Sequence, residues 1–344
     1  MIMINIKHKL WKCVPLALLL CLLLIRGARA DDGSVVRCGF FPNITHAHAL
    51  LMQSFAREGN AEFSIPGIKL EWKAFNAGPS AMEALYAGAV DMTYVGPSPV
   101  LNAYLRAQGR GVRVVSGATR GGAGLVVHGG SGLRVPEDFR GKRIATPQLG
   151  NTQDIACRNW LLDAGLNVSL GGGDVRVAPT ANPDQLPLFL SGDVDAVWTV
   201  EPWLSRLLAA GGELAYAEPV ETCIVTVLAA RENLLEKKPE ALRGVLNLHE
   251  ALNAWMQEHP EEARRRVADE LSRITRREFP RALVEAAWPT MRFRTDISAE
   301  DFATSFAAAL RAGFLKEERN TRELLTKITV SAGEQLEEGA DEQR

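Results

Sequence analysis

The chain has 344 residues, of which 47% are hydrophobic and 23% charged, a composition typical of a folded protein rather than a disordered one. A length of this order predicts about two domains or lobes. The formal net charge is −2, but residues 1–30 contain five basic residues and no acid, so the remainder has 34 basic and 41 acidic residues, about −7. An acidic chain without a basic stripe argues against nucleic acid as a partner.

The first thirty residues have the three parts of a secretory signal peptide. Three lysines precede an apolar run at residues 13–25, and Ala28-Arg29-Ala30 follows it. The run is shorter than the roughly 20 residues that an ordinary transmembrane helix needs. We expect cleavage after Ala30 and a soluble, periplasmic form. A lipoprotein anchored through Cys21 is the alternative, although Leu20 is larger than the small residue that such anchoring requires.

Three cysteines follow this leader, namely Cys38, Cys157 and Cys223. An odd number without C-x-x-C spacing predicts neither a disulfide framework nor a zinc ribbon. We expect small buried side chains, and the sequence leaves open whether Cys157 and Cys223 pair.

Short apolar runs alternate with helical stretches along the rest of the chain, which predicts an α/β fold with parallel sheets covered by helices on both faces. From about Arg231 the pattern changes to helices separated by prolines. Residues 331–344 hold five acids and one arginine, which predicts a disordered acidic tail. In chain order we expect strands at 35–40, 68–73, 92–95, 112–117, 125–128, 142–145, 175–178 and 196–199, and helices at 46–58, 80–87, 152–164 and 182–190.

A short internal repeat indicates two lobes of similar topology. Residues 85–91 (LYAGAVD) are followed by a short strand and Gly96-Pro97, and residues 190–195 (LSGDVD) by a short strand and Glu201-Pro202. Glycine after a helix suits the left-handed C′ position, and proline suits the first turn of the next helix. The alternative is that both segments carry the glycine and proline signals found at helix ends in α/β proteins generally, without a duplicated topology.

Polar loops follow five of the predicted strands, where open parallel sheets bind their ligands. Most of these loops open a helix, whose unpaired N–H groups and dipole favour an anion. Taken singly, each loop is better explained by N-capping through Asn43, Thr45, Ser98 or Asn151. Their shared position after strand ends in both halves is what favours a binding site. The loops are residues 41–46, 96–99, 116–119, 146–154 and 200–203.

Aromatic residues near these loops predict an apolar wall. Phe40, Phe41 and Trp203 lie in or beside the loops, whereas Trp198 falls inside a strand and is expected in the core. Glu201 has three open roles: it can accept from an ammonium group, cap its helix, or pair with a surface arginine.

Catalytic motifs are sparse, because the chain has no G-x-S-x-G, H-E-x-x-H or G-K-[ST] sequence. His46 and His48 are two residues apart, so they point to different sides of a helix and form a weak metal pair. Cys157 with His46 or His128 is a conceivable nucleophile and base, but a buried thiol is the expected role. We therefore predict no catalytic residue, no metal site and no cofactor.

These loops resemble the nitrate/sulfonate/taurine group of periplasmic solute-binding proteins, the receptors of ABC importers, whose fold thiamine-precursor proteins share. The resemblance covers about residues 34–315 and rests on residues 40–47, 91–97, 147–154 and 195–203. It implies a two-lobed type II binding-protein fold, with each lobe a sheet flanked by helices and two crossing strands near 121–127 and 223–228. The implied lobes are residues 31–124 with 225–330, and residues 125–224.

The same resemblance implies where a ligand is bound. The loops contain no lysine or arginine, so an oxyanion would depend on neutral donors, and the cysteine-rich motif of thiamine-pyrimidine synthases is absent. The implied ligand-binding residues are Phe41, Asn43, Thr45, His46, Gly96, Ser98, Ser116, Gly117, Asn151, Thr152, Gln153, Glu201 and Trp203.

We therefore expect a non-enzymatic, monomeric receptor that captures a small anionic or zwitterionic solute, such as a sulfonate, taurine or nitrate, and delivers it to an ABC permease. One alternative keeps the fold and binds a neutral heterocycle such as a pyrimidine vitamin precursor, with Glu201 reading an amino group. A secreted enzyme using Cys157 or a histidine, and a sensor module that presents its lobe to a membrane partner, are the others.

Overall fold

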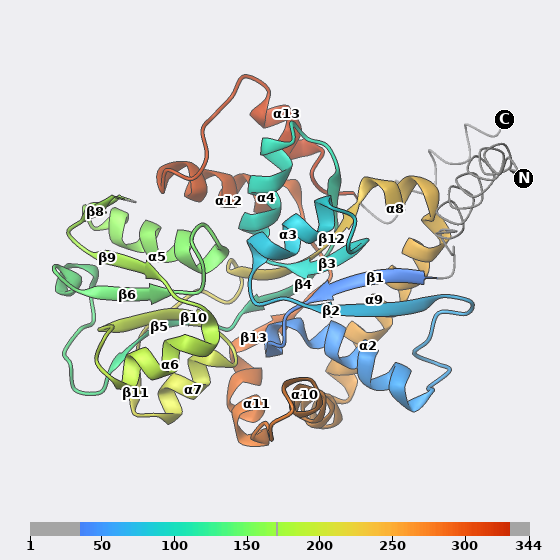
Figure 1. Ribbon diagram of the computed structural model, residues 1–344, viewed down its shortest axis with the longest axis horizontal. Coiled ribbons are helices and arrows are strands. Elements are labelled where there is room, and N and C mark those ends of the chain that lie inside the picture. Colours follow the sequence, from blue (N-terminus) through green and yellow to red (C-terminus); the bar gives the residue numbers. More distant parts are fainter. Residues whose placement is uncertain (1–34, 170, 331–344) are drawn as a thin grey trace, which may run out of the picture.

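The computed structural model describes residues 35–169 and 171–330, which form two α/β lobes side by side (Figure 1). Each lobe is built on one mixed sheet. In lobe I the strand order is β13 (Met291–Phe293), β4 (Val112–Gly121), β12 (Ile224–Arg231), β3 (Met92–Val95), β1 (Val35–Phe40) and β2 (Lys69–Ala74). In lobe II it is β11 (Gly212–Ala217), β5 (Ala123–His128), β10 (Ala196–Val200), β6 (Arg143–Thr146) and β9 (Arg176–Pro179), with a small separate hairpin of β7 (Val168–Ser169) and β8 (Gly172–Gly173).

Helices cover both faces of each sheet, so the cores lie between sheet and helices. Trp198 is 1% exposed, which confirms its predicted place in the core of lobe II. The helices of lobe II are α5 (Thr152–Asp163), α6 (Asn182–Leu190) and α7 (Trp203–Ala209), with the 3₁₀ turn η2 (Pro136–Phe139). Those of lobe I are η1 (Ile44–His46), α2 (Ala47–Glu58), α3 (Gly78–Tyr86), α4 (Pro97–Arg106), α8 (Glu232–Lys237), α9 (Pro239–Glu258), α10 (Pro260–Thr275), α11 (Arg281–Ala287), η3 (Trp288–Thr290), α12 (Ala299–Arg311) and α13 (Thr321–Thr326).

The expectation of parallel sheets is wrong for part of each sheet. β1 pairs in parallel with β2 and β3, and β6 with β9 and β10, as in ordinary β-α-β units. The pairs β12–β3, β12–β4, β13–β4, β10–β5 and β11–β5 are antiparallel. β12 and β13 in lobe I and β5 in lobe II therefore run opposite to the other strands of their sheets, because the chain enters lobe II along β5 and returns to lobe I along β12.

Two chain segments connect the lobes. The first passes from β4 to β5 through Gly122, and the second returns between β11 and β12. Gly121 and Gly122 have φ values of 75° and 68°, which glycine adopts without strain, and the Gly121 N–H donates to the Cys223 carbonyl across the two connections at 2.7 Å. Residues of both connections form a small apolar cluster, namely Ala123, Val200, Cys223 and Val225, with Trp203 packed against it.

The two copies of the short internal repeat make the same hydrogen bonds, one copy in each lobe. In lobe I the backbone N–H of Arg37 donates to the Asp91 carboxylate at 2.9 Å, and the Arg37 side chain donates to the carbonyl of Gly88. In lobe II the N–H of Arg143 donates to Asp195 at 2.8 Å, and its side chain donates to the Gly192 carbonyl. Each lobe thus joins its helix end to its sheet in the same way.

The predicted leader at residues 1–30 and the tail at 331–344 lie outside the described residues. Within the described part, no helix combines the length and apolar character needed to cross a membrane. Cys38, Cys157 and Cys223 are buried free thiols, so Cys157 and Cys223 do not pair here.

Candidate functional site

A cavity of about 30 Å³ lies where the two lobes meet, at the carboxyl ends of the parallel strands. Eight of the predicted ligand-binding residues line it, from loops more than a hundred residues apart in sequence. Those eight are Phe41, Asn43, Thr45, His46, Gly96, Asn151, Thr152 and Gln153; the other lining residues are Asn76, Ala77, Gly78, Pro99, Pro147, Asn182, Val200 and Val225.

Four helices of nine or more residues begin at this cavity, two from each lobe. The lining includes the first residues of α3 and the N-cap of α4 in lobe I, and the first residues of α5 and α6 in lobe II. The N–H groups of a first helical turn have no partner within the helix, and the dipole makes that end positive, although the prolines in the first turns of α3, α4 and α6 contribute no N–H. The convergence of these four helix starts therefore favours a negatively charged group, although the cavity lining has no cationic side chain.

The start of α5 is held rigidly by a buried network. Asn151 accepts from the Asp154 N–H at 2.9 Å, which is the N-cap predicted for it. Asp154 in turn accepts from the Thr146 hydroxyl, the Gly150 N–H and Arg158, all at 3.1 Å or less. These contacts fix the loop so that Thr152 and Gln153 face the cavity without the cost of ordering on binding.

The two lobes touch at Gly96 and Thr152. A Cβ atom on Gly96 would lie 2.4 Å from the Thr152 hydroxyl oxygen, so only glycine permits this approach. The same hydroxyl is buried and has no hydrogen-bond partner among the described residues. Because buried polar groups are nearly always paired, the Thr152 hydroxyl is a donor available to a ligand.

His46 provides a neutral donor at the cavity. Its Nδ1 accepts from the Phe41 N–H at 3.2 Å and its ring stacks on Phe41 with centroids 4.5 Å apart. Burial lowers the pKa of His46 to about 3, so the ring is uncharged at physiological pH and carries its proton on Nε2. His48 instead faces Asn253 and His249, so the two histidines diverge as their spacing predicted.

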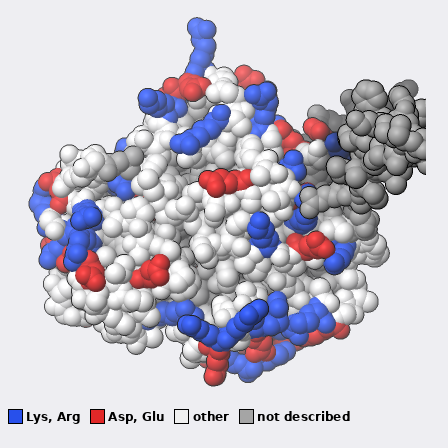
Figure 2. Space-filling model, in the orientation of Figure 1, with Lys and Arg blue, Asp and Glu red and all other residues white. Residues whose placement is uncertain are grey.

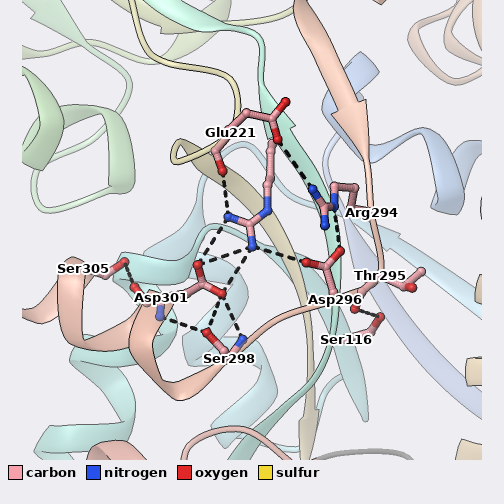
Figure 3. A network of polar contacts seen from close by, with 9 residues as sticks. Ser116, Glu221, Arg294, Thr295, Asp296, Ser298, Asp301 and Ser305 are labelled. Carbon is pink, nitrogen blue, oxygen red and sulfur yellow. Dashed lines mark hydrogen bonds and ion pairs between the residues drawn. The ribbon is translucent and has the colours of Figure 1, made fainter.

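Three predicted residues on lobe I lie away from the cavity lining. Ser98 is buried in the first turn of α4. Ser116 donates to the Thr295 carbonyl at 3.1 Å, beside an ionic network on the loop before α12 (Figure 3). Gly117 is covered by the same loop, because a Cβ there would lie 2.5 Å from the Asp296 carbonyl. This loop comes from a part of the chain almost 180 residues further on, which no local pattern reveals.

Glu201 and Trp203 also lie outside the lining. The fully buried Glu201 carboxylate accepts from the Ser205 N–H and hydroxyl, at 3.1 and 2.9 Å, which is the helix-capping role among the three considered. Burial raises the pKa of Glu201 to about 7, and the two bonds from Ser205 oppose that rise. Trp203 donates from Nε1 to the Asn43 side chain at 3.0 Å, which is a bond between the lobes.

Trp203 belongs to a second, larger hollow beside the cavity, with a volume of about 200 Å³. This adjoining cleft shares Asn43, Asn76 and Asn182 with the cavity. Its remaining lining residues are Pro42, Phe75, Pro183, Pro202, Trp203, Arg206, Thr275 and Phe279.

Asn76, Gly78 and Asn182 are site residues that the sequence analysis missed. Asn76-Ala77-Gly78 follows β2 and Asn182 follows β9, so both positions obey the carboxyl-end rule already applied to other strands. The signal was present, since each segment is a short polar loop between a predicted strand and a proline-containing helix start.

The lining combines hydrogen-bonding groups with apolar ones. Its residues are amides, hydroxyls, one neutral histidine and apolar groups, without an acid, a lysine or a cysteine. Cys157 is buried in the core of lobe II, where desolvation raises its thiol pKa well above the usual range and disfavours the nucleophilic thiolate.

Comparisons with known proteins agree with this architecture. The chain is 27% identical over 184 residues to the taurine-binding periplasmic protein of Escherichia coli K12, so the match spans about half of each, 52% and 54%. The alkanesulfonate-binding protein of Xanthomonas axonopodis pv. citri bound to MOPS has the same fold, with a TM-score of 0.68, 21% identity and coverage of 87% of this chain and 99% of that one. So does the nitrate-binding protein of Synechocystis PCC 6803, with a TM-score of 0.72, 13% identity and coverage of 90% and 89%.

The two-lobed fold expected from the sequence is therefore that of periplasmic binding proteins. The family model that matches residues 30–272 covers well over half of the chain, and the protein belongs to the NMT1-like family.

Proposed function

We propose that this protein is the periplasmic solute-binding component of an ABC importer and that its cavity takes a small organic anion of the sulfonate and taurine class. The observation that carries the proposal is the convergence of four helix N-termini, from both lobes, on one cavity lined by uncharged donors. The names of the taurine-, alkanesulfonate- and nitrate-binding relatives support the ligand class.

The mechanism follows from having donors on both lobes. A solute that bonds to lobe I and lobe II together is bound more tightly by the closed arrangement than by an open one, so it shifts the population toward closure. A membrane permease can then distinguish the loaded receptor from the empty one by shape.

The test is calorimetric titration of the purified protein with taurine, ethanesulfonate, butanesulfonate and nitrate. Thr152→Ala removes a buried hydroxyl donor and is expected to weaken binding of a sulfonate about 10- to 100-fold, as for a hydrogen bond to a charged group. Thr326→Ala, at an exposed position on α13, is the matched control and should bind like the native protein. Absence of binding to every one of these anions would overturn the proposal.

A neutral heterocycle is the second candidate ligand, favoured by the lack of a charged side chain on the cavity lining. Titration with an aminopyrimidine in the same series decides between them. In this alternative Glu201 is not the contact for an amino group, because its carboxylate is buried and occupied by Ser205.

A further inference from the structure

The adjoining cleft differs from the cavity in carrying a positive charge. Arg206, on α7, is the only ionisable group among its described lining residues. Its guanidinium carbon lies 4.8 Å from the ring centroid of Trp203 and 5.0 Å from that of Phe279, so the charge is held between rings contributed by the two lobes.

Arg206 lacks the acidic partner that many of the other described arginines have. Figure 2 shows Lys and Arg side chains gathered over α10 and α11 with acids among them, and there Arg265 lies 3.1 Å from Asp269 and Arg266 lies 2.8 Å from Glu262. Within residues 35–169 and 171–330, the half-buried Arg206 side chain makes no ion pair or hydrogen bond. Desolvation lowers its pKa below the ordinary arginine value with no acid to offset it. A partly dehydrated cation of this kind is stabilised by an anion.

The volumes of the two hollows indicate how a solute would occupy them. The cavity, at about 30 Å³, holds roughly two water molecules, whereas the adjoining cleft is about 200 Å³. An organic acid with several carbon atoms therefore extends from the cavity past Asn43, Asn76 and Asn182 into the cleft. The proline and phenylalanine side chains there suit its apolar part.

We propose that Arg206 is a specificity-determining residue that pairs with a second acid group of an organic dianion whose first acid group lies at the helix N-termini of the cavity and whose carbon chain reaches into the adjoining cleft. This rests on the proposed function, since it narrows the solute class of the same receptor. The uncharged donors of the cavity would bind the first acid group, and Arg206 would bind the second.

The test compares affinities for 4-sulfobutanoate, which has two acid groups, and for butanesulfonate, which has one, in the native protein, Arg206→Gln and Arg206→Lys, at 20 and 300 mM salt. Arg206→Gln should weaken 4-sulfobutanoate binding about tenfold or more and reduce its salt dependence, while binding of butanesulfonate is unchanged. Arg206→Lys should keep most of the affinity. Arg176→Gln, at an exposed position on β9 of the same lobe, is the control.

The outcomes separate the two proposals. Equal affinity of the native protein and Arg206→Gln for 4-sulfobutanoate would overturn the role of Arg206 and leave the proposed function standing. Binding of nitrate alone would do the same, because nitrate is small and has no carbon chain to reach the cleft. Native protein that binds none of these anions would remove the proposed function and this inference with it. Should Arg206→Gln fail to fold, the native protein decides: binding of 4-sulfobutanoate about tenfold tighter than that of butanesulfonate at 20 mM salt supports the role, and binding that is no tighter overturns it.

Discussion

At the scale of single residues, Gly96 and Thr152 control how closely the lobes approach. Gly96 has a φ of −69° and a ψ of 152°, which alanine adopts without strain, so substitution there leaves the start of α4 intact. The added Cβ would instead overlap the Thr152 hydroxyl, at 2.4 Å, while the Thr152 Cβ lies at an acceptable 3.4 Å.

Gly96→Ala is therefore expected to keep the folded state but prevent full closure, with ligand affinity reduced at least about tenfold, a cost typical of overpacking. The double variant Gly96→Ala, Thr152→Ala removes the overlapping oxygen and should recover the affinity of Thr152→Ala alone. Titration calorimetry measures both. A double variant that binds about tenfold more weakly than Thr152→Ala alone would show that this contact does not limit closure.

At the scale of elements, α12 bridges the two lobes. It begins at a capping box formed by Ser298 and Asp301, and Phe302 and Phe306 are buried against lobe I. Its C-terminal end contacts α5 of lobe II, where the Ala308 carbonyl accepts from Asn159 at 2.8 Å and Arg311 lies 2.6 Å from Asp163.

Arg311→Ala removes the ion pair with Asp163 and the hydrogen bond that Arg311 Nε donates to the Asn159 side chain, and so destabilises the closed arrangement. Because the ion pair is half exposed, we expect the closed arrangement to lose about 1 kcal/mol or less relative to the open one. This loss should appear as up to roughly fivefold weaker ligand binding, and as a larger radius of gyration of the unliganded protein in X-ray scattering. Arg322→Ala, which breaks an exposed ion pair with Glu317, is the control. An unchanged radius and affinity for Arg311→Ala would contradict a bridging role.

The base of α12 is also tied to both connections between the lobes. Figure 3 shows the loop before α12 beside Glu221 of the return connection, and Arg120 of β4 lies within 3.3 Å of Asp301 and donates to the Glu221 carbonyl at 3.1 Å. The three segments therefore move as one unit at the junction, with α12 extending from it.

At the scale of the whole molecule, stability depends on pH through Glu201, which is buried at the junction of the lobes. Its N–H donates to the Gly122 carbonyl at 2.8 Å, and burial raises its pKa from 4.5 to about 7. The folded state therefore holds this proton more tightly than the unfolded state does. With respect to this group, stability is highest below about pH 4.5, falls as the pH rises to about 7, and changes no further above that.

Glu201→Gln is expected to remove this loss, so the variant should be more stable than the native protein by roughly 3 kcal/mol at pH 8 and similar to it near pH 5. Urea unfolding at a series of pH values measures the difference. Other buried groups, such as Glu218 and His249, titrate equally in both proteins and cancel. A difference in unfolding free energy that stays constant with pH would contradict the assignment.

Much of the fold was predictable because its signals are local. The strands Val35–Phe40 and Met92–Val95 were predicted with the bounds observed, since short apolar runs bounded by polar or turn residues are typical of buried strands. The direction of β12 was not predictable in this way, because an apolar run carries no information about which neighbour it pairs with.

By itself the sequence determined the helix starts at Thr152 and Asn182, the N-cap at Asn151, the burial of Trp198 and the uncharged side chains of the loops, all of which depend on residue type and short-range spacing. The tertiary structure alone decided which loops meet: it brought Asn76 and Asn182 to the cavity, turned Ser116 toward Thr295, and placed Arg206 between aromatic rings of two lobes. The physical reason is that these arrangements depend on strand order and on contacts between residues more than seventy positions apart, which no local period encodes.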